Sequence, residues 1–163
     1  MKNKIVILVV IMFVIFFSGC IQSNTSQIDG LSSTINSHIK NGDQYYNNSA
    51  KAVNQFQYST ALNYCNNASS EFNMAQSSAK QGLTYAQNSN DTVYTNYMQN
   101  VVNELDAKIN ATEELKAAIS YLQVNDTVSA NTHIGSANDF MNNAVQFNNL
   151  RQQIIQQNPT KFK

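Results

Sequence analysis

Residues that could carry out acid–base or metal chemistry are few and widely spaced in this 163-residue sequence. The only histidines are His38 and His133, and no Glu has a His three residues later. Bundles that hold two iron or manganese ions use such Glu-x-x-His pairs. The Cys-x-x-Cys and His-x-x-x-His spacings of zinc and c-type haem sites are also absent from the sequence. We therefore predict no metal and no cofactor, and we interpret both histidines as structural or surface residues.

The carboxylates and the thiol give no catalytic pattern either. Glu113 and Glu114 are adjacent, and adjacent residues of a helix point in different directions. Glu104 precedes Lys108 by four residues, the order that favours an exposed ion pair. Cys65 stands at an apolar position, where a thiol is buried and unreactive. An enzyme would need a cleft that brings a histidine against a carboxylate, and no spacing in the sequence suggests one. The sequence thus predicts a non-enzymatic protein.

Six Asn residues are followed two positions later by Ser or Thr without an intervening Pro, which is the acceptor pattern for N-glycosylation. Random placement of the same residues would give about 4 such sequons, so a polar surface without sugar is the alternative. Asn90 and Asn125 are the leading candidates, because each begins an Asn-Asp-Thr-Val sequence at a predicted helix junction. The other candidates are Asn24, Asn47, Asn67 and Asn110.

The N-terminus has the pattern of a targeting segment. Lys2 and Lys4 precede an apolar run of 13 residues, 5–17, which ends at Ser18-Gly19-Cys20. A basic segment, a short apolar segment and small residues at a cleavage point are typical of a secretory signal. The sequence Phe17-Ser18-Gly19-Cys20 resembles the lipobox of prokaryotic lipoproteins, although the first position of that box is usually Leu or another aliphatic residue.

The lipobox resemblance implies that Cys20 receives a diacylglyceryl group and becomes the N-terminus of the mature chain. It therefore predicts a lipid-anchored protein on the outer, extracytoplasmic face of the cell membrane, with membrane lipid as one partner through Cys20. An uncleaved helical anchor is the alternative. That alternative is weaker because the apolar run of 13 residues is shorter than the ~20 residues that a spanning helix needs.

The composition indicates a nearly neutral, amide-rich domain. Residues 20–163 contain 8 basic and 10 acidic side chains, so no basic patch exists to bind nucleic acid. The sequence has 25 Asn and 15 Gln but only 5 Gly and 1 Pro, and the scarcity of Gly and Pro favours long helices. If Cys20 is lipidated, Cys65 has no partner, and no disulfide is expected.

Apolar residues recur at alternating steps of three and four, the spacing of a buried helical stripe. Four segments carry such a stripe. Its members are Ile28, Leu31, Ile35, Ile39, Tyr46 and Val53; Ala61, Cys65, Ala68, Phe72, Ala75, Ala79, Gly82 and Ala86; Met98, Val101, Leu105, Ile109, Thr112, Leu115, Ile119 and Leu122; and Ala130, Ile134, Ala137, Met141 and Ala144, widened by Phe140, Phe147 and Ile154.

Short breaks separate the four segments. Two are Asn90–Val93 and Asn125–Val128, where Asp or Thr can cap the next helix. The first lies near 55–59, with Ser59 as a candidate cap, and the sequence 41–43 (Asn-Gly-Asp) is a candidate kink or split in the first helix. Loops this short make neighbouring helices antiparallel. We predict an all-α, up-down-up-down four-helix bundle over residues 27–157, after a signal peptide (1–19) and a lipidated Cys and tether (20–26), and before a C-terminal tail (158–163).

A second fold is open. The sequence from Tyr58 to Ala68 resembles the second-helix region of a tetratricopeptide repeat, a family whose two-helix hairpins fill about 34 residues. The resemblance implies a short helical-repeat solenoid, whereas each interval here has the pattern of a single helix. A shift of 69 or 70 residues places the apolar positions of the first half on those of the second. Both an internal duplication and a chance match of two heptad patterns explain that shift.

These patterns support two functional hypotheses. The leading one is a non-catalytic binding or scaffolding module at the cell surface, whose partner is a protein or a cell-surface polymer, and which needs an exposed groove. The alternative is a carrier of a small ligand, which needs a cavity of roughly a few hundred Å³ between helices. A fully packed core would exclude the carrier.

Overall fold

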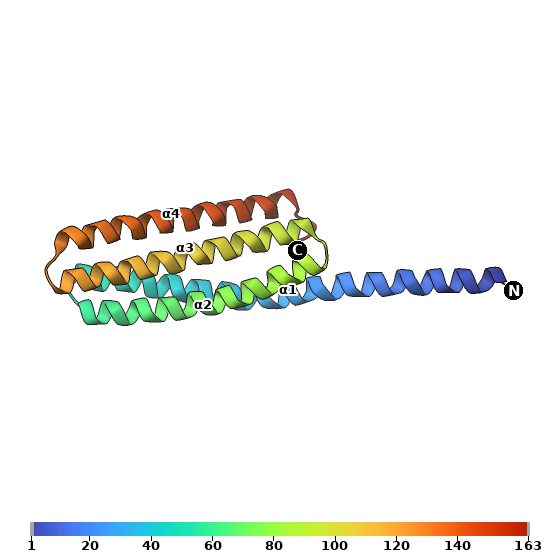
Figure 1. Ribbon diagram of the computed structural model, residues 1–163, viewed down its shortest axis with the longest axis horizontal. Helices are drawn as coiled ribbons and strands as arrows, with labels where there is room; N and C mark the ends of the chain where they lie inside the picture. Colours follow the sequence, from blue (N-terminus) through green and yellow to red (C-terminus); the bar gives the residue numbers. More distant parts are fainter. Residues whose placement is uncertain (1, 163) are drawn as a thin grey trace.

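The computed structural model describes the backbone of residues 2–162 and the side chains of residues 26–162. Within that part of the chain it contains four long helices and no strands: α1 (Lys2–Asn54), α2 (Tyr58–Asn88), α3 (Thr92–Gln123) and α4 (Thr127–Gln157). Successive helices run in opposite directions and lie side by side in an elongated bundle (Figure 1). The predicted all-α four-helix bundle is confirmed. The solenoid alternative is wrong, because a single helix fills each interval between loops.

Three loops of one kind connect the helices. Each loop contains a residue with positive φ: Phe56 at 60°, Asn90 at 53° and Asn125 at 60°. The N–H of the following residue donates to a carbonyl five residues back, as Asp91 does to Ala86 at 3.3 Å, and this bond closes the end of the helix. Asn tolerates the left-handed backbone, but a bulky residue is strained there. The first loop is therefore the strained one.

Aspartates cap α3 and α4, as predicted from the sequence. Oδ1 of Asp91 accepts hydrogen bonds from the backbone N–H groups of Val93 and Tyr94 at 3.0 and 3.2 Å. Oδ1 of Asp126 accepts from the N–H of Ser129 at 3.0 Å. This backbone bond, together with a hydrogen bond from the Ser129 hydroxyl, lowers the pKa of Asp126 below its ordinary value. The two carboxylates therefore satisfy N–H groups that a helix start leaves unpaired.

The first helix junction differs from the prediction. Ser59 lies inside α2, and the residue at the capping position is Gln57, whose side chain makes no capping hydrogen bond. The sequence 41–43 does not split the first helix, because α1 continues through it. A Cβ atom at Gly42 would lie 2.4 Å from Cε1 of Phe72. This glycine therefore marks a close approach between α1 and a buried ring, and not a helix break.

Small side chains line the inner face of α2. The eight predicted stripe positions are the eight buried residues of this helix, and six of them are Ala or Gly. Phe72, the largest fully buried side chain, is the exception in size. Because Ala and Gly keep helix axes close, α2 packs tightly against both α1 and α3. This prediction of the sequence is confirmed residue by residue.

The C-terminal tail folds back onto α3. The ring of Phe162 lies 5.0 Å from that of Tyr94 and 4.9 Å from that of Tyr97, measured between centroids. The hydroxyl of Tyr94 donates to the backbone oxygen of Lys161, and the ammonium of Lys161 pairs with Asp91. The tail predicted from the sequence therefore covers the start of α3.

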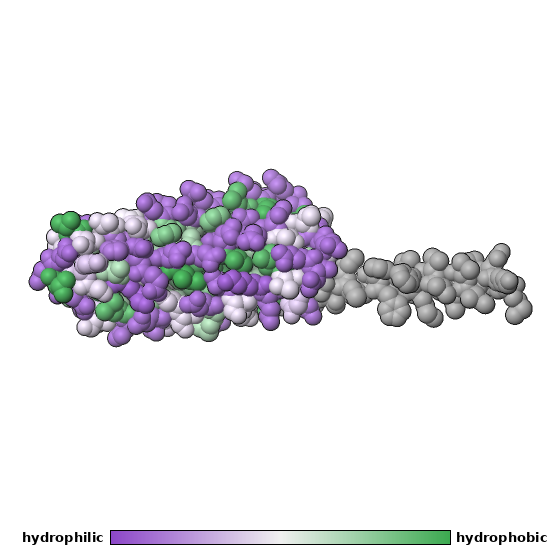
Figure 2. All heavy atoms as spheres, viewed as in Figure 1, coloured by the Kyte–Doolittle hydropathy of each residue, from purple (hydrophilic) through white to green (hydrophobic). Residues whose placement is uncertain are grey.

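Hydrophilic residues dominate the visible surface of the bundle, with hydrophobic residues scattered among them (Figure 2). The most exposed large apolar side chains are Phe56, Val124 and Val128, which lie at or next to the α1–α2 and α3–α4 loops. Both loops lie at the end of the bundle opposite the N-terminus (Figure 1). None of the helices, over the residues described, has an apolar stretch long enough to cross a membrane.

Candidate functional site

A cleft runs between α1 and α4. In the described part of the chain, no Cα atom of α4 lies within 8 Å of a Cα atom of α1, whereas α2 packs on α1 and α3, and α3 packs on α4. Two cavities lie along this cleft, with α1 and α4 as walls and α3 beneath them. The first has a volume of about 230 Å³ and is lined by Ile39, Asp43, Glu104, Lys108, Met141, Ala144, Val145, Asn148 and Arg151. The second has a volume of about 160 Å³ and is lined by Tyr46, Ala50, Val53, Asn54, Leu115, Ile134, Ala137 and Asn138.

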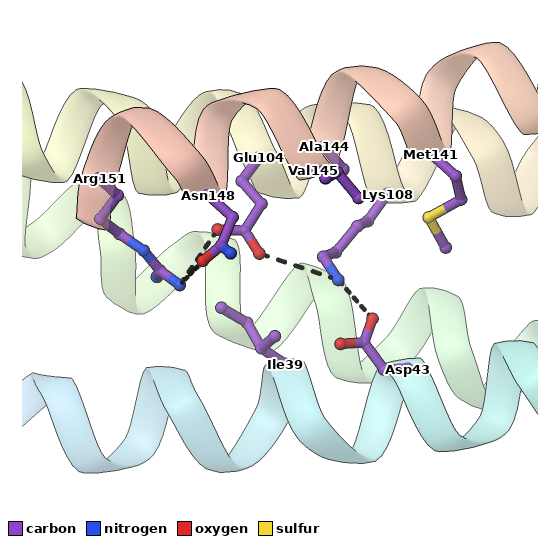
Figure 3. Close-up of a pocket in the computed structure, with 9 residues that line it drawn as sticks. All are labelled: Ile39, Asp43, Glu104, Lys108, Met141, Ala144, Val145, Asn148 and Arg151. Atoms are coloured by element: carbon purple, nitrogen blue, oxygen red, sulfur yellow. Dashed lines mark hydrogen bonds and ion pairs between the residues drawn. The ribbon is translucent and has the colours of Figure 1, made fainter. Parts of the chain in front are cut away.

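The larger cavity contains a row of alternating charges (Figure 3). Asp43 of α1 pairs with Lys108 of α3. Nζ of Lys108 lies 3.8 Å from Oε1 of Glu104, and Oε2 of Glu104 lies 3.3 Å from Nη2 of Arg151 on α4. The same Nη2 donates to Oδ1 of Asn148 at 2.8 Å. The row therefore joins three helices across the cleft.

Three of the four charged residues in this row are buried. Glu104 is 3% exposed, and Lys108 and Arg151 are each 8% exposed. The prediction of an exposed Glu104–Lys108 ion pair is therefore wrong. The reason is that α3 packs between α2 and α4 and also approaches α1, so that it buries a wider arc than one apolar stripe.

The buried row is incompletely hydrogen-bonded. Among the residues that the structure describes, Oε2 of Glu104 and both Nε and Nη1 of Arg151 have no hydrogen-bond partner. Burial raises the pKa of Glu104, and the charges of Arg151 and Lys108 oppose that rise only in part. A buried polar atom without a partner is unfavourable, and such atoms are rare in folded proteins. All three atoms are closed to solvent, so they lie buried beneath the cleft and do not line its open space.

Aromatic rings flank the two buried cations. Nζ of Lys108 lies 5.6 Å from the centre of the Phe72 ring, and Cζ of Arg151 lies 5.9 Å from that of Tyr97. Both distances are within the ~6 Å at which a ring face attracts a cation. These rings hold the long side chains of Lys108 and Arg151 in place beneath the cleft.

Each histidine lies against a carboxylate of the neighbouring helix. Nδ1 of His38 is 2.7 Å from Oε2 of Glu71, and Nδ1 of His133 is 2.6 Å from Oε2 of Glu114. The ring of His133 also stacks on that of Tyr121 at 5.2 Å. These contacts were missed by sequence spacing because they join different helices. Both pairs lie outside the two cavities of the cleft.

Cys65 is buried, as the sequence predicts. Its Sγ lies 3.0 Å from Oγ of Ser49. The Ser49 hydroxyl also donates a hydrogen bond to the carbonyl oxygen of Ala61. Burial raises the pKa of the Cys65 thiol. The protonated thiol is therefore the favoured form at this position, and it packs between α1 and α2.

The candidate glycosylation sites fall into two groups. Asn90 and Asn125 are exposed in loops, and the Thr of each sequon is exposed as well. Asn47 is exposed on α1, but its sequon ends at the buried Ser49. Among these three, only the two loop sites have both the Asn and the Thr of the sequon exposed. Cys20 and Asn24, the predicted lipidation site and another sequon, lie outside the residues whose side chains are described.

No cluster of three or more His, Cys, Asp or Glu side chains suited to a metal ion is found among the described residues. Searches of protein-family models, of curated proteins and of solved structures gave no match to this chain.

The sequence reasoning missed Asp43 and Arg151 as site residues, yet a signal for Arg151 was present. Arg151 is the only arginine of the chain. It follows Ala144 by seven residues, and Ala130, Ala137 and Ala144 are themselves spaced by seven. Extending this heptad by one step predicts a buried position at residue 151. A lone arginine at a buried heptad position is the pattern that indicates the site.

Proposed function

We propose that this chain is a non-catalytic binding module, anchored by lipid to the outer face of the cell membrane, with the α1–α4 cleft as its binding surface. The observation that carries the binding role is the cleft itself, which combines partly exposed apolar walls with buried and incompletely paired charges. Binding sites in proteins are typically concave and apolar with a few polar groups, and this cleft has that character.

The anchoring part of the proposal depends on the sequence of residues 1–20. It is tested by the intact mass of the protein extracted from its host membrane with detergent. A mass that matches residues 20–163 plus lipid would support Cys20 as the anchor, and sugar-sized increments would support glycosylation at the loop sequons. A mass that matches the whole chain without lipid would contradict the anchor and leave the cleft unaffected.

The binding part is tested with envelope material from the host. The purified chain is incubated with an envelope fraction that contains surface polymers and membrane proteins, and the retained amount is measured. Val145 is 57% exposed at the wall of the larger cavity, so Val145→Trp should fill the opening and reduce retention. Val128→Trp is the matched control, since Val128 is 78% exposed on the same helix and lines neither cavity of the cleft.

Equal retention of the two tryptophan variants would remove the cleft as the binding surface. Loss of retention for Val145→Trp alone would support it and would justify identifying the retained partner, a protein or a surface polymer.

A carrier of a small ligand is the second candidate function. The observation that favours it is the 230 Å³ cavity between α1 and α4, which both apolar and charged residues line. The carrier differs from the surface module in the size of what it binds, and both functions use the same cleft.

A further inference from the structure

Both walls of the α1–α4 cleft carry the spacing of a coiled-coil seam. The residues that line the two cavities include Ile39, Asp43, Tyr46, Ala50 and Val53 on α1, and Ile134, Asn138, Met141, Val145 and Asn148 on α4. On each helix these residues are separated by steps of four, three, four and three. A seam with this spacing is the surface that one helix presents to another. In the described part of the chain α1 and α4 do not pack on each other, so neither seam has a helix against it there.

The walls of the cleft favour a helix as the occupant. The backbone groups of α1 and α4 are hydrogen-bonded within these helices, so the walls present side chains only. A peptide that lies in the cleft must therefore satisfy its own backbone N–H and C=O groups. An α-helix does so and an extended strand does not, and an amphipathic helix in an apolar groove is a common mode of peptide recognition.

The two cavities define where large side chains of such a helix would lie. Corresponding lining residues of the larger and the smaller cavity are eleven positions apart on both walls, as in Ile39 and Ala50 on α1 and in Val145 and Ile134 on α4. Eleven residues of a helix span about 16 Å and make about three full turns, so residues eleven apart lie on one face. A helix aligned with the cleft can therefore place one large apolar side chain in each cavity.

The α1 rim of the cleft is basic. Lys40 and Lys51 are exposed, each follows a residue that lines one of the cavities, and they are themselves eleven positions apart. Asp43, within the larger cavity, pairs with Lys108. Asp139 is exposed on α4, but it lies two residues from the cavity-lining Met141 and thus about 200° around the helix. The exposed charge beside the cavities is therefore positive, and it complements acidic residues on a bound helix.

We propose that the α1–α4 cleft binds one amphipathic α-helix of a partner protein, which places a large apolar residue in each cavity and acidic residues beside Lys40 and Lys51. This inference rests on the proposed role of the cleft as the binding surface, and it specifies the partner as a protein helix. The bound helix lies above the buried row of charges and packs on both open seams.

The test is selection from a displayed library of peptides of about 20 residues, built from helix-forming residues with apolar, acidic and basic side chains varied at every position. The target is the purified chain, immobilised. We expect enriched peptides to carry large apolar residues eleven apart, with Asp or Glu beside them in preference to Lys or Arg. They should bind with a Kd of about 10 μM or below and become helical on binding, as measured by circular dichroism.

Variants at the two cavities separate a helix from a small ligand. Val145→Trp fills the larger cavity and Ala50→Trp fills the smaller. Each should weaken binding of the enriched peptides roughly ten-fold or more, because the helix uses both cavities, whereas Val128→Trp should leave binding unchanged. Circular dichroism of each free variant verifies its fold. A molecule held in a single cavity would respond to only one of the two substitutions.

Variants at the rim test the charge of the partner. Lys40→Glu and Lys51→Glu should each weaken binding of the enriched peptides roughly three-fold at low salt, and less at high salt. Lys80→Glu is the matched control, since Lys80 is exposed on α2 and lines neither cavity. It should leave binding unchanged.

Four results would overturn the helix site. The library yields no peptide that prefers the parent over the tryptophan variants; the enriched peptides are basic or lack the paired apolar residues; only one of the two cavities matters; or the chain dimerises through the cleft, so that a second copy is the occupant. Retention by envelope material that survives protease digestion of that material would also overturn it, in favour of a surface polymer.

Failure of this inference is distinguishable from failure of the proposed function. If no helix binds while Val145→Trp still abolishes retention by envelope material, the class of partner is wrong and the cleft remains the binding surface. If that retention is also unaffected, both proposals fail.

Discussion

The two sides of α1 differ sharply. On one side α1 packs closely against α2, whose inner face consists mainly of alanine and glycine. On the other side α1 faces α4 across the cleft, where α1 presents Asp43 and Tyr46 and α4 presents Met141 and Asn148. Small side chains allow helix backbones to approach, whereas long and polar side chains hold them apart and keep contact with solvent. A bundle seam thus closes or stays open according to the side chains that face it.

The largest expected effect on stability comes from truncating a side chain in the closely packed seam between α1 and α2. Phe72 is completely buried beneath α1, so Phe72→Ala should lower the free energy of unfolding by about 3–5 kcal/mol. Urea unfolding followed by circular dichroism measures the change. A loss below ~1 kcal/mol would mean that the α1–α2 seam is not closely packed.

A matched pair of valines compares the two regions directly. Val101 is 1% exposed in the core, and Val145 is 57% exposed at the cleft. Val101→Ala should lower the free energy of unfolding by about 2 kcal/mol, from two lost methyl groups and the cavity they leave. Val145→Ala should change it by no more than ~0.5 kcal/mol. Similar losses at both positions, measured by urea unfolding, would show that α1 covers Val145 and that the cleft is closed.

The first loop offers a stabilising change. Phe56 has a φ of 60° and is 79% exposed, whereas the equivalent positions of the other loops are Asn90 and Asn125. Phe56→Asn should raise the free energy of unfolding by about 1 kcal/mol, because Asn adopts the left-handed backbone at lower cost. The reverse change, Asn125→Phe, should lower it by a similar amount. Thermal unfolding of both variants measures the two changes in stability. A stabilised Asn125→Phe protein would contradict the claim that a bulky residue is strained in the left-handed backbone of these loops.

The smallest effect is a pH dependence at Glu104. Burial raises the pKa of Glu104 in the folded chain, so the folded protein holds this proton more tightly than the unfolded chain does. The contribution of Glu104 to stability is therefore greatest at acidic pH. It falls as the pH rises from the unfolded value of about 4.3 through the raised folded value.

Glu104→Gln removes this titration and serves as the reference. The stability of the parent relative to Glu104→Gln should decline over that pH range, as measured by urea midpoints at a series of pH values. A relative stability that rises with pH would mean that Arg151 and Lys108 outweigh the effect of burial.

Much of the fold was predictable from heptad spacing, because one buried stripe on a helix repeats every seven residues. The stripe of α2 was identified completely, and Asp91 and Asp126 were identified as helix caps. The position of the cleft was not predictable. Ile134 and Met141 have the spacing of core residues, but they are only half-buried, because α1 does not pack against α4 there. The spacing of apolar residues along one helix does not say how closely a second helix approaches it. The charge row was missed because Glu104 and Lys108, read on α3 alone, have the pattern of an exposed pair.

The central claim, an open seam between α1 and α4 beside a closed one, is tested most directly by disulfide trapping at neighbouring residues of α1. Both experiments use a Cys20→Ser background. Ser49→Cys places a second thiol opposite Cys65, where the present Oγ–Sγ distance is 3.0 Å, so the pair should oxidise readily. Ala50→Cys with Asn138→Cys, in a chain that also carries Cys65→Ser, spans the cleft with Cα atoms more than 8 Å apart.

Because a disulfide needs Cα atoms within about 7 Å, we predict rapid oxidation of the Ser49→Cys chain and no disulfide in the Ala50→Cys, Asn138→Cys chain. Intact mass before and after alkylation counts the free thiols of each. Equally rapid oxidation of both pairs would contradict the account, because α4 would then lie as close to α1 as α2 does.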